Sequence, residues 1–263
     1  MMTDEKIGII GFGAIGQEIY KKISRKIISG YIVIGVFSED IEDQKIPKKI
    51  KCNSVEELLK KKPKVIIEAA SVEACRNYAE KILKNKIDFM CLSVCSFADQ
   101  SFFKKINLLV KKIKSKIYIP TGAISGLDAI SSASISNELT DVTLIQRKPP
   151  KALVSLLESK KIKKEKVLSK STARRICKKF PKNSNIAATL AICGLGFDKT
   201  KVVVIADPKI KKNIAEIKAT GKFGKLKIFL QNNPSKNPKT SRLTAMSVLL
   251  SLDKRKNYFL TAF

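Results

Sequence analysis

Residues 6–23 read KIGIIGFGAIGQEIYKKI, and this stretch indicates the fold of the first part of the chain. The apolar run 6–10 predicts a buried strand, the pattern GFGAIG follows it at 11–16, and isoleucines then recur at the spacing of one helix face. In that context the first glycine permits a tight turn, the second lets backbone N–H groups approach a pyrophosphate, and the third lets helix and strand pack closely. A purely structural glycine turn is the alternative. We predict a dinucleotide-binding loop with contacts from Gly11, Gly13, Ala14, Ile15 and Gly16.

The rest of the first 120 residues alternates short apolar runs with helical patterns. Such alternation is typical of an α/β fold with a parallel, doubly wound sheet of the Rossmann type. Ser54 and Glu57 have the spacing of a capping box that opens a helix. Further strands are expected at 31–37, 64–70, 89–94 and 116–120.

Beyond Pro120 the pattern changes, because strand-like runs now follow one another with short turns. This predicts a second domain of the α+β type with a largely antiparallel sheet. Its strands are expected at 141–148, 201–208, 213–220 and 225–232. A closing helix is expected at 240–254, capped by Thr240 or Ser241. We therefore expect a dinucleotide-binding domain of residues 1–120 and a second domain of residues 121–233.

The choice of nicotinamide cofactor depends on the end of the second strand, where the chain reads FSED at 37–40. An acidic residue in this place binds the free ribose 2′-hydroxyl of NAD and repels the 2′-phosphate of NADP. Glu39 or Asp40 can take that role, so NAD is the expected cofactor. Ser38 is compatible with a phosphate, so NADP remains an alternative. Three cations also follow nearby: Lys45, Lys48 and Lys49.

The chain is strongly basic, with 52 Lys and Arg residues against 23 Asp and Glu and a formal charge of +29. Only seven of the basic residues are arginine, and aromatic residues do not gather with them in a stripe. A solvated basic surface is therefore favoured over a specific nucleic-acid site. Nonspecific binding to polyanions at low salt is still expected from the charge alone.

Six cysteines lie mostly inside apolar runs and show no paired framework, which favours a reducing compartment. The close pair Cys91 and Cys95 lacks a second pair and any histidine, so no metal is expected. No stretch reaches the ~18 apolar residues of a membrane helix. The expectation is a cytoplasmic protein with no membrane partner.

Ordered motifs run along nearly the whole chain. They are GFGAIG at 11–16, EAAS at 68–71, IYIPTGAISGLDAI at 117–130, RKPPKAL at 147–153, FPKNSNIAATLA at 180–191, GLGFDKT at 194–200, IADP at 205–208, GKFG at 221–224 and NPKTSRLTAMS at 237–247. Together they resemble the L-aspartate dehydrogenase family. The resemblance implies nicotinamide-dependent oxidation of aspartate, a small acidic amino acid, to iminoaspartate for NAD biosynthesis. It also implies that the tail 234–263 joins the first domain, and that residues 121–233 bind the substrate and form a homodimer.

The resemblance further implies roles for particular residues. Nicotinamide contacts are expected from Ala123 and Asn185. The family's Asn-x-His-Glu motif falls on residues 213–216, so its acid/base position holds Ala215, and the chain contains no histidine elsewhere. Lys239 and Asp207 lie in loops that the family places near the active cleft and are the candidate proton carriers. A solvated loop cation and a turn residue are their alternative roles.

Three functions are compatible with these residues. The first is an aspartate dehydrogenase that works slowly, since an acid/base group typically contributes about 10²–10⁴-fold to a rate. The second is a catalytically silent dinucleotide-binding protein. The third is a reductase of a different imine or ketone, because the family's Ser-Val-Gly-Ala-Leu run becomes SVCSF at 93–97.

Overall fold

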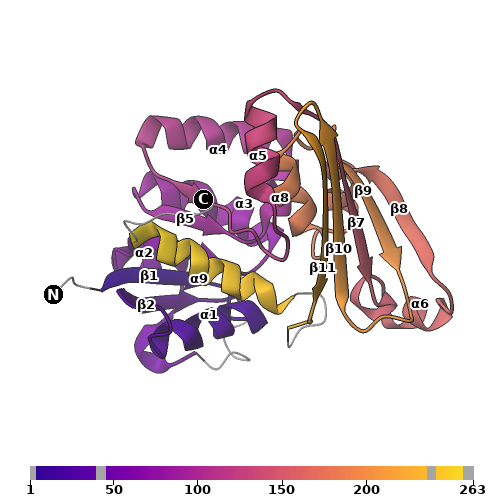
Figure 1. Ribbon diagram of the computed structural model, residues 1–263. Coiled ribbons are helices and arrows are strands. Elements are labelled where there is room, and N and C mark those ends of the chain that lie inside the picture. The colour runs from indigo at the N-terminus through magenta and orange to yellow at the C-terminus, as the bar shows by residue number, and fades with distance from the viewer. Residues whose placement is uncertain (1–3, 40–45, 236–240, 257–263) are drawn as a thin grey trace. The chain divides into compact units, whose positions relative to one another are not determined.

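The computed structural model describes residues 4–39, 46–235 and 241–256. Its contacts divide the chain into two compact units, shown in Figure 1. The first unit takes Met1–Pro120 and Ala245–Asn257, and the second takes Thr121–Thr244. The chain thus returns to the first unit at Ala245, later than the expected residue 234.

The first unit is built on a six-stranded sheet whose neighbouring strands are all parallel, in the order β3-β2-β1-β4-β5-β6. This is the strand order of a dinucleotide-binding Rossmann sheet. Successive strands are added on one side of β1 up to β3, and on its other side from β4 onward. The strands are β1 (Glu5–Ile10), β2 (Tyr31–Phe37), β3 (Lys51–Cys52), β4 (Val65–Glu68), β5 (Asp88–Cys91) and β6 (Ile117–Tyr118). The expected fold class is confirmed for this part of the chain.

Helices cover the sheet of the first unit through apolar faces. Ile19 and Ile23 of the first helix are buried in its core, as the isoleucine spacing predicts. Ser54 caps the second helix by accepting a hydrogen bond from the Glu57 backbone N–H, although the Glu57 carboxylate accepts from Asn53 rather than from Ser54. The helices are α1 (Ala14–Ser24), α2 (Val55–Lys60), α3 (Val72–Lys84) and α4 (Gln100–Ile113), with 3-10 turns η1 (Lys48–Ile50) and η2 (Val94–Ala98).

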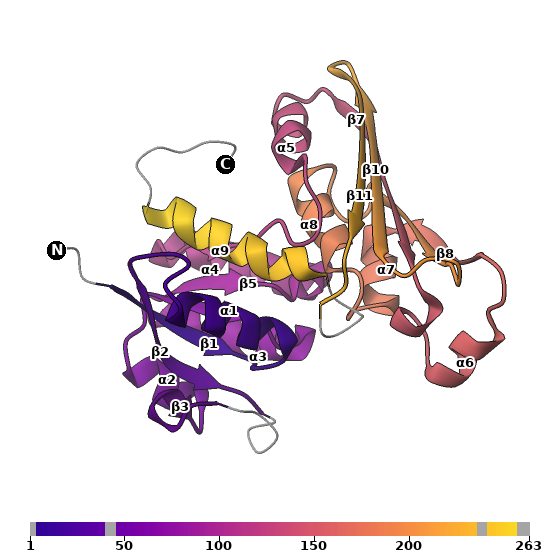
Figure 2. The ribbon, with the colours of Figure 1, turned by 60° about the horizontal axis from the view of Figure 1, so that its bottom comes forward.

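The last helix, α9 (Arg242–Lys256), adds its side chains to the core of the first unit. Val248 and Leu252 lie in the same apolar cluster as Ile19, and Figures 1 and 2 both show α9 alongside α1. The Tyr31 hydroxyl donates to the Leu252 carbonyl at 2.6 Å. Arg255 binds both Asp88 and Glu5, at 2.6 and 2.8 Å. A helix distant in sequence is therefore fixed to β1, β2 and β5.

The second unit contains a five-stranded mixed sheet in the order β11-β10-β7-β9-β8. Three of its neighbouring pairs are antiparallel, and β7 with β9 is parallel. The strands are β7 (Leu139–Lys148), β8 (Lys166–Thr172), β9 (Lys201–Ala206), β10 (Asn213–Gly221) and β11 (Gly224–Asn232). The largely antiparallel sheet is confirmed. The parallel pair and the strand β8 were not expected.

Helices α5 and α8 lie on one face of this second sheet (Figure 1). Along β7 and β10 the buried side chains alternate with partly exposed ones, which is the pattern of a sheet covered on one face. The helices of this unit are α5 (Leu127–Ile135), α6 (Leu156–Lys161), α7 (Ala173–Lys179) and α8 (Asn185–Cys193), with the 3-10 turn η3 (Pro150–Ala152). A complete capping box occurs here, between Ser155 and Glu158.

Candidate cofactor and substrate sites

Two glycines of the 11–16 loop are required by the fold itself. Gly11 has φ +88°, and a side chain there would lie 2.7 Å from the Ala70 methyl. A side chain at Gly16 would lie 2.2 Å from the Gly11 carbonyl oxygen, so α1 could not pack against the end of β1. These contacts match the turn and packing roles expected of the first and third glycines.

Gly13 has no such internal reason to be glycine. Its φ is −68°, which any residue adopts, and a side chain there would meet no atom of the described residues within 4 Å. Gly13 is also the N-cap of α1, and no described side chain caps this end of the helix. Unpaired N–H groups and the helix dipole attract anions at such a terminus. The open space above Gly13, with Ala14 and Ile15 beginning the helix, therefore fits the diphosphate of a dinucleotide.

The predicted ribose contact follows β2 and lies next to this loop. The Gly11 N–H donates to the Phe37 carbonyl at 2.8 Å, which joins the loop to the end of β2. Glu39 is exposed, and its carboxylate accepts a hydrogen bond from the Tyr78 hydroxyl at 3.1 Å. The lysines at 48 and 49 are exposed on η1. The other two candidates, Asp40 and Lys45, lie outside the described residues.

A buried carboxyl group that the sequence did not single out ties the ends of β4 and β5 together. Glu68 is fully buried. Its oxygens accept from the Ala70 N–H at 2.8 Å, the Ser93 hydroxyl at 2.8 Å and the Ser93 N–H at 3.0 Å. Burial raises the pKa of Glu68, although these donors act in the opposite direction. Because the Ala69 N–H donates to Ile10, this network supports the strand end that adjoins the glycine loop.

Three potential metal ligands also meet at this place, where no metal was expected. Glu68, Cys75 and Cys91 each offer an atom within 4.8 Å of the other two. The Cys91 thiol contacts Cys75 at 3.5 Å, and Cys75 contacts the Ser96 hydroxyl at 3.0 Å. Burial raises the pKa of Cys91 well above its ordinary value, which opposes the thiolate form that a metal needs. The three groups fit one another as hydrogen-bond partners.

In the second unit Ala215 lies on the buried face of β10 and is 3% exposed. Its register partners are Gln146 on β7 and Leu230 on β11. Asn213 shares this face two residues away, and its side-chain amide donates to the buried Ser241 hydroxyl at 3.3 Å. Lys148 is buried at the end of β7 and lies 3.4 Å from the Asn183 carbonyl oxygen. One end of the sheet's buried face is therefore polar.

Of the other two predicted substrate-side residues, the structure describes Asp207 alone. Asp207 interacts with Arg147 at 3.4 Å and accepts from the Lys209 N–H at 2.9 Å. Arg147 follows Gln146 in β7 and so points to the opposite face of the sheet. Asp207 is thus held by a side chain from the face opposite to Ala215, and its role as a proton carrier stays a prediction. Lys239 lies outside the described residues.

The two residues expected to contact the nicotinamide each lie next to a close approach within the second unit, that of Gly122 to Ile186. Asn185 begins α8 and is followed by Ile186. A side chain at Gly122 would lie 3.6 Å from a methyl group of Ile186. Ala123 follows Gly122, is buried, and its carbonyl accepts from the Asn232 side chain at 2.9 Å. The structure thus brings the 121–123 loop to the start of α8.

Sequence reasoning missed Glu68, Gln146 and Lys148 as candidate site residues. The motifs EAAS and RKPPKAL contain Glu68 and Lys148, so their signal was present but had no role attached to it. A cavity of about 640 Å³ lies elsewhere, at the end of the first sheet where β4 and β5 begin. Its lining includes Lys60, Lys64 and Lys86 and none of the predicted site residues.

Comparisons with known proteins agree with both units. The family model described as "Aspartate dehydrogenase, C-terminal" matches residues 128–255, and the one described as "Homoserine dehydrogenase, NAD binding domain" matches residues 11–120. The crystal structure of aspartate dehydrogenase from Thermotoga maritima superposes with a TM-score of 0.77 at 26% identity, covering 99% of each chain. A hyperthermophilic archaeal homoserine dehydrogenase, at 13% identity and a TM-score of 0.62, shares the fold.

Two relatives in sequence carry the same name. The L-aspartate dehydrogenase of Methanosarcina barkeri is 37% identical over 95% of this chain and 96% of its own length. That of Archaeoglobus fulgidus is 37% identical over 92% of this chain and 94% of its own length. With this identity along nearly the whole chain, and with the Rossmann sheet and glycine loop described above, the protein belongs to the L-aspartate dehydrogenase family.

Proposed function

We propose that this protein oxidises L-aspartate to iminoaspartate with NAD, as the names of its relatives suggest. The single observation that carries the proposal is Gly13, a glycine with ordinary φ whose missing side chain leaves open space at an uncapped helix N-terminus. In a member of this family, such a space is best explained by a dinucleotide phosphate. NAD, when bound, accepts a hydride.

Substrate groups would meet the polar end of the second unit's sheet. The buried ammonium of Lys148 and the Asn213–Ser241 pair offer the positive charge and the donors that a carboxylate requires. Aspartate must lose one ammonium proton before hydride can leave Cα and the C=N bond can form. Ala215 cannot accept that proton, and the Asp207 carboxylate is paired with Arg147. We infer that the amine is taken up already deprotonated, so the rate rises toward alkaline pH.

NAD is proposed over NADP because Glu39 follows β2 beside the glycine loop, where its charge repels a 2′-phosphate. Lys48 and Lys49 are exposed on η1 and favour the opposite choice. Titrating both cofactors against the same protein tests this proposal. A preference of about ten-fold or more for NADP would overturn it.

The test of the activity is an assay of NADH formation with L-aspartate alongside a panel of other amino acids. Aspartate-dependent NADH formation is the expected result. A protein that binds NAD but oxidises another amino acid would instead be a dehydrogenase of different specificity, an alternative that the changed run at 93–97 favours. A protein that binds NAD and oxidises none would be a silent dinucleotide binder.

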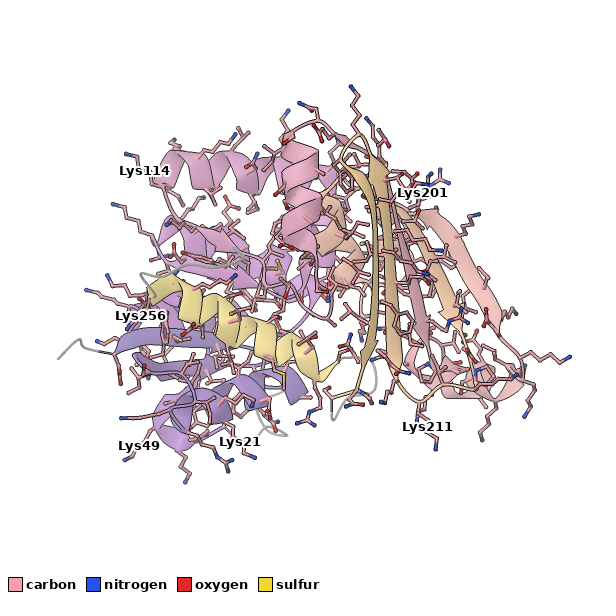
Figure 3. The ribbon with its side chains drawn as sticks, in the orientation of Figure 1. Lys21, Lys49, Lys114, Lys201, Lys211 and Lys256 are labelled. Atoms are coloured by element: carbon pink, nitrogen blue, oxygen red, sulfur yellow. The ribbon has the colours of Figure 1, made fainter. Side chains whose placement is uncertain are left out.

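We also propose a cytoplasmic homodimer that binds no specific nucleic acid. All six cysteines are free thiols, in keeping with a reducing compartment. Among the described helices, none is long and apolar enough to cross a membrane. Phe229 on β11 and Val167 on β8 are exposed, at 61% and 54%, and offer apolar surface for a second copy. The labelled lysines in Figure 3 include Lys21 and Lys49 on the first unit and Lys201 and Lys211 on the second, so the positive charge is spread over both units.

A further inference from the structure

Gln146 is the polar group in the second unit that the fold leaves least explained. It lies on the buried face of β7 and is 1% exposed. Within the described part of the chain, neither its side-chain nitrogen nor its side-chain oxygen has a hydrogen-bond partner. Burying an amide without partners is unfavourable, and native proteins rarely retain one without a ligand, an ion or a water to satisfy it.

The position of Gln146 relates it directly to the substrate-side residues. It is the register partner of Ala215 across the antiparallel β7–β10 pair, so the two side chains stand on the same face in adjacent strands. Lys148, two residues further along β7, and Asn213, two residues before Ala215 on β10, share that face and are buried. On its other side Gln146 pairs with Val204 of β9, which offers no polar atom in its side chain. The unpartnered carboxamide therefore stands on the same buried face as Lys148 and Asn213.

We propose that the carboxamide of Gln146 binds the α-amino group of the substrate. Its oxygen accepts a hydrogen bond from the amino nitrogen, and its nitrogen is left to donate to the neighbouring carboxylate. A carboxamide neither gains nor loses a proton near neutral pH, so Gln146 holds the nitrogen without acting as a base. Gln146 thus binds the amino group beside Ala215, whose methyl side chain offers no polar atom. The inference rests on the proposed function, because it assigns a contact to the same substrate.

The test compares two variants that each remove one unpartnered buried polar group from the second unit. Gln146→Leu keeps a similar volume without the amide. Thr200→Val is the matched control, because the Thr200 hydroxyl is also fully buried and without a partner among the described residues. Calorimetric titration of the NADH-loaded protein measures affinity for L-aspartate and for succinate, which has both carboxylates but no amino group. Thermal unfolding of the ligand-free variants runs in parallel.

We expect Gln146→Leu to weaken aspartate binding by roughly 10- to 100-fold, the usual effect of losing a buried hydrogen bond to a charged or polar ligand group. Succinate affinity should fall by less than about ten-fold, NADH affinity should not change, and the ligand-free variant should unfold at the same temperature or higher. Thr200→Val should leave both ligand affinities unchanged.

Two results would overturn the inference and leave the proposed function standing, and a third would overturn both. If the parent protein oxidises aspartate and Gln146→Leu binds it as tightly, the contact is absent while the function stands. A lower unfolding temperature for Gln146→Leu with equal losses for aspartate and succinate would mean that the amide has a structural role. If the parent protein binds NADH but not aspartate, the proposed function fails and this contact fails with it.

Discussion

Among single residues, the three glycines of the 11–16 loop are required for different reasons. Gly11 and Gly16 are glycine because other atoms of the protein occupy the side-chain space, whereas Gly13 is glycine beside empty space. A substitution at Gly16 should therefore damage the fold, and one at Gly13 should damage binding. This difference separates a cofactor loop from a glycine turn that serves only packing.

We predict that Gly13→Val abolishes NAD binding and leaves the protein folded. Valine is a poorer N-cap than glycine, so the free energy of unfolding should fall by no more than about 1 kcal/mol. Ser24→Val is the control, because it places the same side chain at the exposed other end of α1. Fluorescence titration with NADH and chemical denaturation measure the two effects. Unchanged NADH affinity in Gly13→Val would mean that the cofactor binds elsewhere.

Glu68 gives a prediction about stability. In Glu68→Gln an NH₂ group replaces an oxygen that now accepts from Ala70 or Ser93, so a donor faces a donor. We expect a loss of about 1–3 kcal/mol in the free energy of unfolding at neutral pH. Chemical denaturation of parent and variant measures it. A variant as stable as the parent would mean that the carboxyl network does not hold β4 to β5.

The pH dependence of the same residue has a definite sign. The folded-state pKa of Glu68 is raised, so between its ordinary value and that raised value the folded protein holds a proton that the unfolded chain has lost. The contribution of Glu68 to the free energy of unfolding of the parent protein therefore falls as pH rises through that window. Glu68→Gln should lack this decrease. Denaturation at several pH values gives both curves, and equal slopes for parent and variant would contradict the assignment.

Among the secondary-structure elements, the strand pair β7–β10 limits which side chains fit at position 215. Ala215 and its register partner Gln146 are both buried on one face of the sheet, so an imidazole at 215 would compete with the Gln146 side chain for the same space. Overpacking of this kind typically costs about 1–3 kcal/mol. Restoring an acid/base group there requires a change on both strands.

We predict that Ala215→His gains little alone and gains much when Gln146 is shortened. The double variant Ala215→His with Gln146→Ala should exceed Gln146→Ala in kcat for aspartate by about 10²–10⁴-fold, the contribution of a general acid/base group. Its rate should titrate near the unperturbed histidine pKa of about 6.5, whereas the parent profile is shifted to alkaline pH. A double variant without a transition near neutrality would contradict this account of position 215.

Elements with strong local patterns were predictable from the sequence, and those defined by distant partners were not. The apolar runs of β1, β2 and β10 identified their strands. β8 was missed because its sequence, KVLSKST, is polar and lies at a sheet edge, and β3 is only two residues long. The parallel β7–β9 pair was missed because α7, α8 and β8 separate its strands in sequence.

The candidate site shows the same limit. Gly13 was predictable because the motif and its strand–helix context are local. Gln146 and Glu68 were not, since their importance depends on which atoms surround them. Gln146 is notable for its register with Ala215, and Glu68 for its bonds to Ser93 on a neighbouring strand's end. The spacing of residues in the sequence predicts neither the Gln146–Ala215 register nor the Glu68–Ser93 hydrogen bonds.

At the scale of the whole molecule, charge and association oppose each other. Each chain carries +29, so two copies repel one another at low ionic strength, and salt screens that repulsion within about 10 Å at 0.1 M. Apolar surface around Phe229 is the proposed contact. The dimer should therefore strengthen as salt rises from low to moderate concentration.

Sedimentation velocity tests this with one variant and one control. Phe229→Asp should shift the protein toward monomer at moderate ionic strength. Leu108→Asp is the control, because Leu108 on α4 is 59% exposed and Phe229 61%. It should leave the dimer intact. A parent protein that sediments only as a monomer at moderate salt would refute the homodimer.

Oxidation of aspartate with NAD is measured as the initial rate of NADH formation with L-aspartate, followed by absorbance from neutral to alkaline pH. We predict aspartate-dependent NADH formation that exceeds the rate with every other amino acid in the panel and rises toward alkaline pH. Gly13→Val serves as the blank because it should not bind the cofactor. The prediction is contradicted if the protein binds NAD and forms no NADH with aspartate at any pH at which it remains folded.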